Sequence, residues 1–485
     1  MKYQSTRNAA LTAMPSQAVL QGLAPDGGLY VLPNLRLDFD WQGTLRLDTL
    51  GMATKILSAL LPDYANMDKL TQRAYAGKFE TPDLTPLRQV GDNYVLELFR
   101  GPTSAFKDVA LSMLPQLMVA AKGEEKIVIL TATSGDTGKA ALVGFQDVPG
   151  IDIIVFYPEN GVSAVQKAQM VTQQGKNVHV CAIRGNFDDA QNGVKQVFSA
   201  VTQQNLLAGR KVRLSSANSI NIGRLAPQVV YYFKAYADLE KKGRIRRGDA
   251  VDFVVPTGNF GDILAGFIAK QLGLPVGRLV CASNANNVLT EFIQTGHYDR
   301  RRPFYKTSSP SMDILISSNL ERLLYSLSDG NAETVAALMQ QLSQTGEYQI
   351  DASMLQRLQK DFWAGCCEEA GTSQTIGKLW REQHYLCDTH TAVAWNVAEQ
   401  YRSATKTDAP LVVLSTASAY KFPAAVLKAI DGEACGDEFD QMEQLHRLTG
   451  VPIPAHLAKL RSQPVLHHDV INREEMLSYV LERAK

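Results

Sequence analysis

The chain has 485 residues, more than a single hydrophobic core usually supports, so we expect two or three structural units. Hydrophobic residues make up 45% of the sequence and charged residues 20%, an ordinary balance for a soluble globular protein. The 49 basic and 49 acidic residues cancel, so no net charge favours nucleic acid or an anionic membrane, and an anionic ligand has to be bound by a local site.

The sequence shows no sign of a metal site, a disulfide framework or a membrane anchor. The six cysteines have no C-x-x-C spacing, and the histidines form no pair in a metal-ligand context, so we expect free thiols in a reducing compartment. No apolar run approaches the ~20 residues that span a bilayer, and the N-terminal stretch lacks the apolar region of a secretory signal. We therefore expect a cytoplasmic protein.

Residues 1–85 mix strand and helix signals. Asp26-Gly27-Gly28 followed by Leu29-Tyr30-Val31 predicts a turn that leads into a strand, and residues 50–61 show a helical hydrophobic pattern. The proline-containing stretch at 81–86 is typical of a linker. These signals indicate an N-terminal α+β domain.

After the linker, short apolar runs alternate with helical patterns up to about residue 435, and residues 436–485 look helical and polar. The alternation predicts parallel sheets covered by helices on both faces, with ligands bound beyond the carboxyl ends of the strands. The loops that follow residues 99, 130, 255 and 414 should therefore surround one crevice. The expected strands cover residues 94–99, 126–130, 151–156, 178–183, 251–255, 279–282 and 411–414.

The first of these loops leads into Lys107, at the expected start of a helix over 106–121 with Ser104 as its possible N-cap. A helix N-terminus and apolar neighbours both disfavour a charged amine, which suits a lysine that attacks an aldehyde. A solvated lysine beside an acid, Asp108, is the ordinary alternative and by far the commoner one for a lone lysine.

Two further loops connect a strand to a helix. Residues 131–138, Thr-Ala-Thr-Ser-Gly-Asp-Thr-Gly, expose backbone N–H groups that can hold an anion, although the spacing excludes a nucleotide-binding P-loop and a simple tight turn is an equally good interpretation. Residues 256–262, Pro-Thr-Gly-Asn-Phe-Gly-Asp, combine glycines with a helix N-terminus, which suits a phosphate.

Two later segments carry hydroxyl groups and a guanidinium. In residues 215–224, Arg224 can make a paired contact to a second phosphate, although a polar helix start with a solvated arginine explains the segment better in isolation. At the end of the last apolar strand, a hydroxyl of Ser415 or Thr416 can hydrogen-bond a cofactor ring nitrogen without protonating it. A simple strand end is the alternative there.

Together and in this order, these segments resemble threonine synthase, a fold-type II pyridoxal-phosphate (PLP) enzyme, over nearly the whole chain. The resemblance implies an α/β, tryptophan synthase β-like fold with two lobes (residues 86–435) flanking a cofactor crevice, preceded by a threonine synthase N-terminal domain (1–85) and followed by a helical extension (436–485). The motifs that carry it are residues 17–30, 101–108, 132–138, 216–221 with Arg224, and 256–262.

The same resemblance implies a role for each candidate residue. Lys107 would bind the cofactor covalently and then shuttle protons. The other expected cofactor contacts are Gly258, Asn259, Phe260 and Gly261 at its phosphate with Asp262 beside them, Asp136 near its ring hydroxyl, and Ser415 or Thr416 at its pyridine nitrogen. The expected substrate contacts are Thr133, Ser134 and Thr137 around the substrate, and Asn218, Ser219 and Arg224 at its phosphate. No metal is implied.

The implied reaction converts O-phospho-L-homoserine and water to L-threonine and phosphate, the last step of threonine biosynthesis. A phospholyase that releases 2-oxobutyrate, ammonia and phosphate, and a non-catalytic metabolite-binding relative, both stay open as alternatives. The Asn218–Arg224 segment and the N-terminal domain disfavour a dehydratase or a cysteine synthase. We expect a small-molecule substrate as the partner, neither nucleic acid nor a membrane, and a monomer or homodimer.

Three positions depart from the family pattern. Arg100 stands where a histidine is expected, Lys139 follows a glycine where small residues are common, and residues 418–420 replace the usual His-Pro before Lys-Phe. These departures concern substrate fit rather than cofactor binding.

Overall fold

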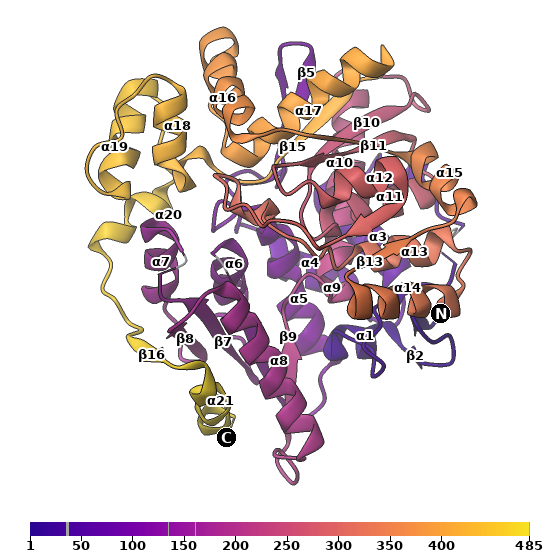
Figure 1. Cartoon of the computed structure of the whole chain (residues 1–485), viewed down its shortest axis with the longest axis vertical. Coiled ribbons are helices and arrows are strands. Elements are labelled where there is room, and N and C mark those ends of the chain that lie inside the picture. Colours follow the sequence, from indigo (N-terminus) through magenta and orange to yellow (C-terminus); the bar gives the residue numbers. More distant parts are fainter. Residues whose placement is uncertain (35–37, 134, 161, 485) are drawn as a thin grey trace.

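The computed structural model describes residues 1–34, 38–133, 135–160 and 162–484. Two parallel-sheet lobes lie one above the other in Figure 1, and the N-terminal elements lie beside them at the lower right. This is the fold class that the alternating strand and helix pattern predicts. Within the described residues, no helix is both long enough and apolar enough to cross a membrane.

The upper lobe contains a six-stranded sheet in the order β14-β11-β10-β15-β5-β4. All neighbouring strands are parallel except β4 and β5, which form an antiparallel pair. Helices α11, α12 and α15 contact the sheet on one side, and α17 lies across four of its strands, with α16 packed on α17. The strands are β4 (Leu87–Val90), β5 (Asn93–Glu97), β10 (Val251–Pro256), β11 (Val276–Ser283), β14 (Phe362–Cys366) and β15 (Leu411–Ser415), and the helices are α10 (Val229–Lys241), α11 (Gly261–Gln271), α12 (Val288–Thr295), α15 (Ala352–Asp361), α16 (Glu369–Gln383) and α17 (Thr389–Thr405).

The lower lobe contains a five-stranded, all-parallel sheet in the order β16-β8-β7-β6-β9. Helix α8 packs on β6 and β7, with α21 against α8, and α6 packs on β7 between α5 and α7. The strands are β6 (Lys126–Ala132), β7 (Ile151–Pro158), β8 (Val178–Ile183), β9 (Val212–Ser216) and β16 (Asp469–Ile471), and the helices are α5 (Lys107–Ala121), α6 (Asp136–Phe145), α7 (Ala164–Val171), α8 (Phe187–Gln203) and α21 (Met476–Arg483).

The N-terminal elements share one continuous hydrophobic core with both lobes. Tyr75 of α4, for example, is buried and donates its hydroxyl to the backbone carbonyl of Val109 in α5. The expected strand after Asp26-Gly27-Gly28 is β3, and the expected helix over 50–61 is α3. The elements are β1 (Tyr3–Ser5), β2 (Thr12–Ala13), β3 (Tyr30–Val31), α1 (Pro15–Gln21), α2 (Trp41–Thr44), α3 (Thr49–Leu60) and α4 (Met67–Tyr75).

A third region, between β11 and β14, packs against helices α11, α12 and α15 of the upper lobe. It contains a two-stranded antiparallel sheet of β12 and β13 together with short helices. Its elements are β12 (His297–Asp299), η2 (Pro310–Met312), α13 (Leu320–Leu327), α14 (Ala332–Thr345) and β13 (Glu347–Gln349). Elsewhere in the chain, the short helices α9 (Ile222–Leu225) and η1 (Ala226–Gln228) follow β9 of the lower lobe and precede α10 of the upper lobe.

The C-terminal segment contacts both lobes. In Figure 1 it runs in yellow from α18 and α19 at the upper left down to α21 beside the lower sheet. It is helical for the most part, as predicted, but it also supplies β16, which pairs with β8 and which the sequence did not predict. Its elements are η3 (Ala419–Lys421), α18 (Pro423–Ala429), α19 (Glu438–Thr449), α20 (Ala455–Ala458), η4 (Leu460–Ser462), β16, η5 (Arg473–Glu475) and α21.

Two local features bear on the sequence predictions. Ser104 is not the N-cap of α5: it has a left-handed backbone with φ of 58°, and the N-cap is Phe106. The hydroxyl of Ser104 instead lies 3.1 Å from Nε2 of His456 in α20. The six cysteines, all within the described residues, form no disulfide.

Candidate active site

Lys107 is the first residue of α5 and lies between the two lobes. Its Nζ lies 4.0 Å from Oδ2 of Asp136, at the start of α6, and 3.5 Å from Oγ of Ser311 in η2. Only 12% of the Lys107 side chain is exposed, so the bulk solvent does not surround its amine. Three segments far apart in the sequence therefore meet at this nitrogen.

The surroundings of Lys107 make its amine easier to deprotonate than that of an ordinary lysine. Burial lowers the pKa of Lys107 to about 8, because taking an ammonium out of water disfavours its charged form. The carboxylate of Asp136 opposes this shift in pKa, and the nearby cations Lys421 and Arg224 add to it. At pH 7 a minor fraction of this amine, on the order of a tenth, is thus unprotonated. That fraction is far larger than for an ordinary lysine, and an amine must be unprotonated to attack a carbonyl carbon.

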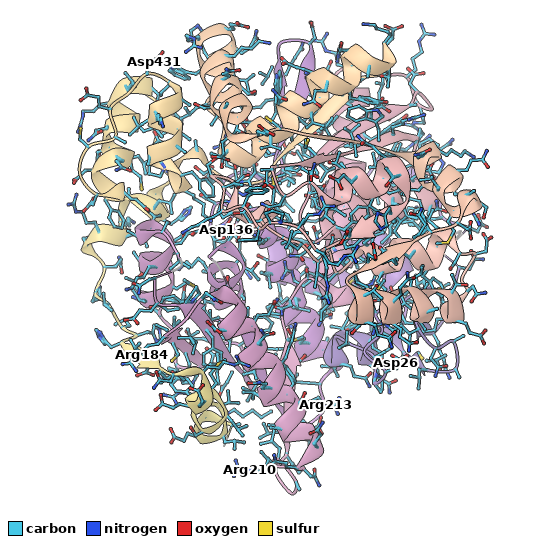
Figure 2. All side chains as sticks on the ribbon, viewed as in Figure 1. Asp26, Asp136, Arg184, Arg210, Arg213 and Asp431 are labelled. Atoms are coloured by element: carbon cyan, nitrogen blue, oxygen red, sulfur yellow. The ribbon has the colours of Figure 1, made fainter. Side chains whose placement is uncertain are left out.

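Asp136 forms an ion pair with a second buried lysine, Lys421. The Nζ of Lys421 lies 2.5 Å from Oδ1 of Asp136, and Gln166 donates to the same oxygen from 3.0 Å. Burial alone would raise the pKa of Asp136, but the ammonium groups of Lys421 and Lys107 outweigh it and hold that pKa below its usual value. Figure 2 labels Asp136 near the middle of the molecule, where the lobes meet. Asp136 therefore presents a fixed negative charge to Lys107.

The loop between β6 and α6 is held in place by one of its own side chains, that of Thr133. The hydroxyl of Thr133 accepts the backbone N–H groups of Gly135 and Gly138, at 3.0 and 2.9 Å. Thr137 is half-buried in the first turn of α6, and Ser134 lies outside the described residues. The structure thus brings this loop to Lys107 through Asp136, while substrate contacts by Thr133, Ser134 and Thr137 stay predictions.

The glycine loop before α11 exposes a row of backbone donors. Phe260 has φ of 62° and caps α11, and its ring is buried. The carbonyl of Gly258 accepts from Ser317 Oγ at 2.7 Å, and that of Asn259 accepts from the backbone N–H of Asn319 at 3.1 Å. Among the described residues, nothing accepts from the N–H groups of Gly258, Asn259 and Phe260. Free N–H groups at a helix N-terminus form an anion site.

Asp262 lies behind this loop as a carboxyl group that resists ionisation. Burial raises its pKa to about 7, although the hydroxyls of Tyr231 and Tyr232 donate to Oδ1 at 2.5 and 3.0 Å. Its Oδ2 has no hydrogen-bond partner in the described part of the chain. A carboxyl group that is neutral below about pH 7 does not repel a phosphate bound at the neighbouring N–H groups.

Arg224 is a buried cation that lacks an acidic partner. It is 2% exposed, its Nη1 donates to the carbonyl of Ala217 at 2.6 Å, and its Nε has no partner among the residues described. Burial lowers its pKa to about 10. An unpaired buried guanidinium is costly unless an anion binds beside it. Asn218 and Ser219 lie half-buried on the same segment, before α9.

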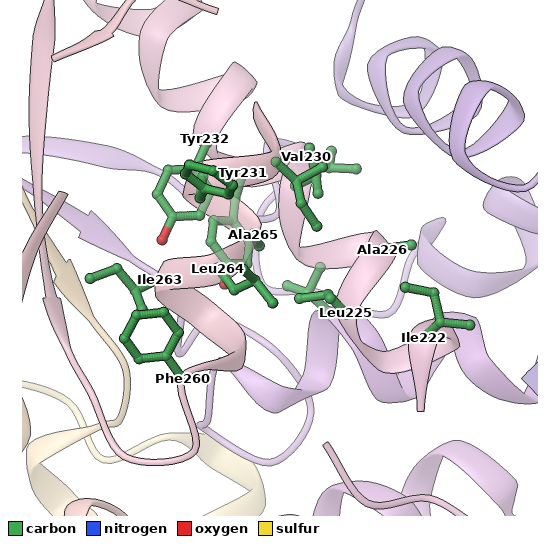
Figure 3. Packing of buried hydrophobic residues seen from close by; sticks show 14 of the residues in the cluster. Ile222, Leu225, Ala226, Val230, Tyr231, Tyr232, Phe260, Ile263, Leu264 and Ala265 are labelled. Carbon is green, nitrogen blue, oxygen red and sulfur yellow. The ribbon is translucent and has the colours of Figure 1, made fainter. Parts of the chain in front are cut away.

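One hydrophobic core supports both anion-binding segments. Figure 3 shows Leu225 of α9 and Leu264 of α11 in the middle of the group, with Ile222 of α9 at one end and Phe260 and Ile263 at the other, and the two helices are in contact. All five side chains are buried. Because such cores are close-packed, the position of Arg224 relative to the glycine loop is fixed.

Ser415 and Thr416 end β15 directly beside Lys107. The backbone N–H of Phe106 donates to the carbonyl of Thr416 at 2.9 Å. The hydroxyl of Ser415 lies 2.8 Å from that of Thr391, and Thr391 in turn donates to Asp388. Because the Thr391 proton is committed to Asp388, Ser415 donates to Thr391. Of the two candidates, only Thr416 then keeps a hydroxyl proton that no described residue accepts.

The two departures with long side chains are paired with residues other than Lys107. Arg100 pairs with Glu97 and Glu80, and the Nζ of Lys139 donates to Gln173 at 2.6 Å. The sequence interpretation also missed residues that the fold brings to the crevice, namely Ser311, Asp388 and His390. Lys421 had a signal in the Lys-Phe pair at 421–422, but nothing in the sequence paired it with Asp136.

The groups that line the crevice suit pyridoxal phosphate. It offers a buried amine for the aldehyde carbon, an ionised carboxylate within 4.0 Å of that amine, and a row of unpaired N–H groups for a phosphate. With two parallel-sheet lobes around it, this arrangement defines a PLP-dependent enzyme of fold type II.

Comparisons with known proteins agree with this class. Residues 81–353 match the family model of pyridoxal-phosphate dependent enzymes, residues 2–75 match that of the threonine synthase N terminus, and residues 391–476 match that of the threonine synthase C-terminal region. The solved structure of PLP-bound threonine synthase from Brucella melitensis superimposes with a TM-score of 0.87 at 38% identity and covers 100% of both chains.

Curated relatives carry the same name or one derived from it. Threonine synthase from Pseudomonas aeruginosa is 40% identical over 95% of this chain and 93% of its own. Threonine synthase-like 1 from Homo sapiens is 39% identical over 86% of this chain, and the match spans only 58% of that longer protein. The chain belongs to the threonine synthase family.

Proposed function

We propose that this enzyme converts O-phospho-L-homoserine and water to L-threonine and phosphate. The observation that supports this most directly is Arg224, a buried guanidinium without an acidic partner, near enough to Lys107 to lower its pKa. Pyridoxal phosphate has one phosphate, and the N–H groups of the glycine loop suit it. The second anion site therefore calls for a substrate that carries its own phosphate.

Each described side chain takes a part in this reaction. Pyridoxal phosphate, when bound, withdraws electrons from the substrate α-carbon and makes its proton acidic. The amine of Lys107 accepts that proton, and Asp136 stabilises the ammonium group that results. Arg224, with Asn218 and Ser219, binds the substrate phosphate and stabilises the charge on it as it leaves. The hydroxyl of Thr416 is our choice for the partner of the pyridine nitrogen.

We propose the cytoplasm as the location of the protein and a monomer or homodimer as its state, with a small molecule as its only substrate. The proposed domains are residues 1–85, 86–435 and 436–485. The core shared between the first two and the strand β16 in the third indicate that the three fold as one unit.

A product assay tests the reaction. We expect the protein with pyridoxal phosphate to release threonine and inorganic phosphate from phosphohomoserine in equal amounts. Release of 2-oxobutyrate and ammonia in place of threonine would assign the phospholyase reaction instead. A cofactor bound covalently to Lys107 without any turnover would indicate a non-catalytic relative.

Replacing Arg224 with alanine tests the second anion site. We expect KM for phosphohomoserine to rise about 100-fold, since a charge-assisted hydrogen-bonded pair is lost, while the dissociation constant of pyridoxal phosphate stays within twofold. Arg213→Ala is the matched control, because Arg213 lies on β9 in the same segment of the chain but pairs with Glu125 at the surface. Weakened cofactor binding in Arg224→Ala, with KM unchanged, would contradict the assignment.

A further inference from the structure

The segment 308–313 joins the two halves of the crevice. Its Ser311 offers Oγ to the amine of Lys107, at 3.5 Å. The carbonyl oxygen of the same residue lies so near Gly258 that a Cβ there would be 2.5 Å from it. Ser311 thus lies between the amine and the glycine loop, and a change in its position would alter its contacts with both.

His390 holds the backbone of Ser311. It is 2% exposed at the start of α17, and its Nε2 lies 3.2 Å from the backbone nitrogen of Ser311. A backbone N–H can only donate, so Nε2 is an acceptor and carries no proton. The proton of the neutral ring is then on Nδ1, which lies 2.7 Å from Oδ2 of Asp388. The two contacts together define a single tautomer.

The carboxylate of Asp388, which accepts from this ring, is itself held in place by hydrogen bonds. It is 0% exposed and caps α17 by accepting the N–H groups of His390 and Thr391. The hydroxyl of Thr391 donates to its Oδ1 as well. On the other side, the ring of Phe422 lies 5.1 Å from the imidazole, centroid to centroid. Both the carboxylate and the imidazole are thus oriented before any ligand binds.

We propose that His390 is a positioning residue: as a neutral imidazole oriented by Asp388, it holds Ser311 so that the Ser311 hydroxyl accepts from the amine of Lys107 and orients the nitrogen lone pair. The contacts run from Asp388 through His390 and the Ser311 backbone to Lys107. The inference rests on the proposed role of Lys107 as the cofactor lysine.

The geometry of a neutral amine explains why this contact matters. Such a nitrogen has two N–H bonds and one lone pair, and only the lone pair attacks a carbonyl carbon or accepts a proton. The carboxylate of Asp136 and the hydroxyl of Ser311 lie 4.0 and 3.5 Å from Nζ. When both N–H bonds point at these acceptors, the lone pair points in the remaining direction. Without Ser311, rotation about the last bond of the side chain spreads the lone pair over several directions.

A second tie between α17 and the same segment supplies a matched control. The hydroxyl of Thr389 donates to the carbonyl of Ser308 at 2.7 Å. Thr389→Val removes this tie without touching Ser311 or the imidazole. If α17 only anchors the segment, Thr389→Val and His390→Phe should have similar effects, whereas our proposal requires them to differ.

The experiment measures how fast Lys107 condenses with its cofactor. Cofactor-free enzyme is mixed with saturating pyridoxal phosphate, and the first-order appearance of the visible absorbance band of the lysine-bound cofactor is followed. We expect Ser311→Ala and His390→Phe each to slow this step about tenfold, the cost of an imprecisely oriented nucleophile. The double variant should be no slower than either single one, because His390 acts through Ser311.

Two more variants and one control complete the design. His390→Gln, which restores an acceptor, should recover part of the lost rate, and Thr389→Val should stay within twofold of the wild type. Thermal melting identifies variants that fold poorly, and Ser311→Ala keeps the test valid if His390→Phe is one of them. Multiplicative slowing in the double variant, equal slowing in Thr389→Val, or an unchanged rate in Ser311→Ala would each overturn the inference.

The outcome separates this inference from the proposed function. Borohydride reduction and peptide mass mapping of the wild type show which lysine carries the cofactor. A cofactor on a lysine other than Lys107 would overturn both proposals. A cofactor on Lys107 with independent effects of Ser311 and His390 would overturn only this one.

Discussion

At the residue scale, one buried cation of the crevice lacks an acidic partner. Lys107 and Lys421 lie against the carboxylate of Asp136, whereas Arg224 pairs with no acidic side chain in the described part of the chain, and burial raises the pKa of Asp108 to about 6. A buried guanidinium without a counter-charge is unfavourable in the absence of an anion, because buried charges need partners. The site is therefore matched to ligands that bring phosphate and carboxylate groups with them.

The charges around Lys107 predict opposite effects of two substitutions. The neutral amine reacts, so condensation with pyridoxal phosphate should speed up as pH rises through the pKa of Lys107, about 8. Asp136 raises that pKa, so Asp136→Asn should move the midpoint of the rate profile to lower pH. Lys421 lowers it, so Lys421→Met should move the midpoint to higher pH.

The measurement is the rate of cofactor rebinding to cofactor-free enzyme between pH 6 and 10. Lys428→Met, on the exposed face of α18, is the control and should leave the midpoint in place. Shifts of Asp136→Asn and Lys421→Met in the same direction would show that these charges do not govern the amine.

At the element scale, four helices begin at the crevice. α5 starts at Lys107, α6 at Asp136, α11 at Gly261 and α17 at Thr389. The N-terminus of each helix carries a partial positive charge. For α5, α6 and α11, which follow β5, β6 and β10, this arrangement follows from the topology of parallel sheets, in which the strand ends that precede helices lie on one edge. α17 instead follows the helix α16.

The glycine loop before α11 gives a prediction at this scale. A Cβ on residue 258 would lie 2.5 Å from the carbonyl oxygen of Ser311, which is backbone and cannot rotate away. Gly258→Ala should therefore displace the loop and raise the dissociation constant of pyridoxal phosphate about tenfold or more, as measured by titration of cofactor-free enzyme. Gly123→Ala, where a Cβ meets nothing within 4 Å, should have no effect. Equal affinities in the two variants would exclude a tight fit at residue 258.

The elements themselves were largely predictable from the sequence. The buried strands read as apolar β-branched runs, and 178–183 matches β8 residue for residue. In the two large sheets, the sequence did not predict β4, β9, β14 and β16, which are short and partly exposed and carry charged, small or aromatic residues in place of a continuous apolar run. The short strands β1, β2, β12 and β13 of the two small sheets were not predicted either. Ser104 fitted the composition of an N-cap, but in the fold its backbone is left-handed and its hydroxyl contacts the distant His456. Local patterns cannot show such contacts.

In the candidate site, too, the sequence predicts the residues that have local patterns but not those that only the tertiary fold brings together. The loops at 131–138 and 256–262 and the lysine between them have local signatures, and the fold brings the first of them within 4.0 Å of Lys107. Ser311, His390 and Lys421 reach the crevice only through the tertiary fold, from positions far along the chain. No spacing rule links residues so distant, so only the structure could assign them.

At the scale of the whole molecule, the C-terminal segment ties the lobes together. His456 of α20 contacts Ser104 near the crevice, and β16 and α21 complete the lower lobe. Burial lowers the pKa of His456 to about 4, so this contact involves a neutral imidazole at physiological pH. The segment therefore serves both the surroundings of the site and the stability of the distant sheet.

Met476 tests the contribution of α21 to stability. It is 1% exposed and packs so closely on α8 that a Cβ at Gly193 would lie 2.2 Å from its sulfur. We expect Met476→Ala to lower the free energy of unfolding by about 2–4 kcal/mol, from lost burial and the cavity left behind. The visible absorbance of the lysine-bound cofactor should not change. Ser478→Ala on the exposed side of α21 is the control, and equal stability of the two variants would contradict the packing argument.

The pairing of β16 with β8 also constrains how the protein matures in the cell. A ribosome makes β16 long after the other strands of that sheet, so the flank of β8 that β16 will cover stays open throughout most of synthesis. Unpaired strand edges pair with other chains, so a protein whose sheet is completed late in synthesis is prone to aggregate before it has folded. The yield of soluble protein from cells should therefore depend on chaperones and growth temperature more strongly than the stability of the folded enzyme alone would predict.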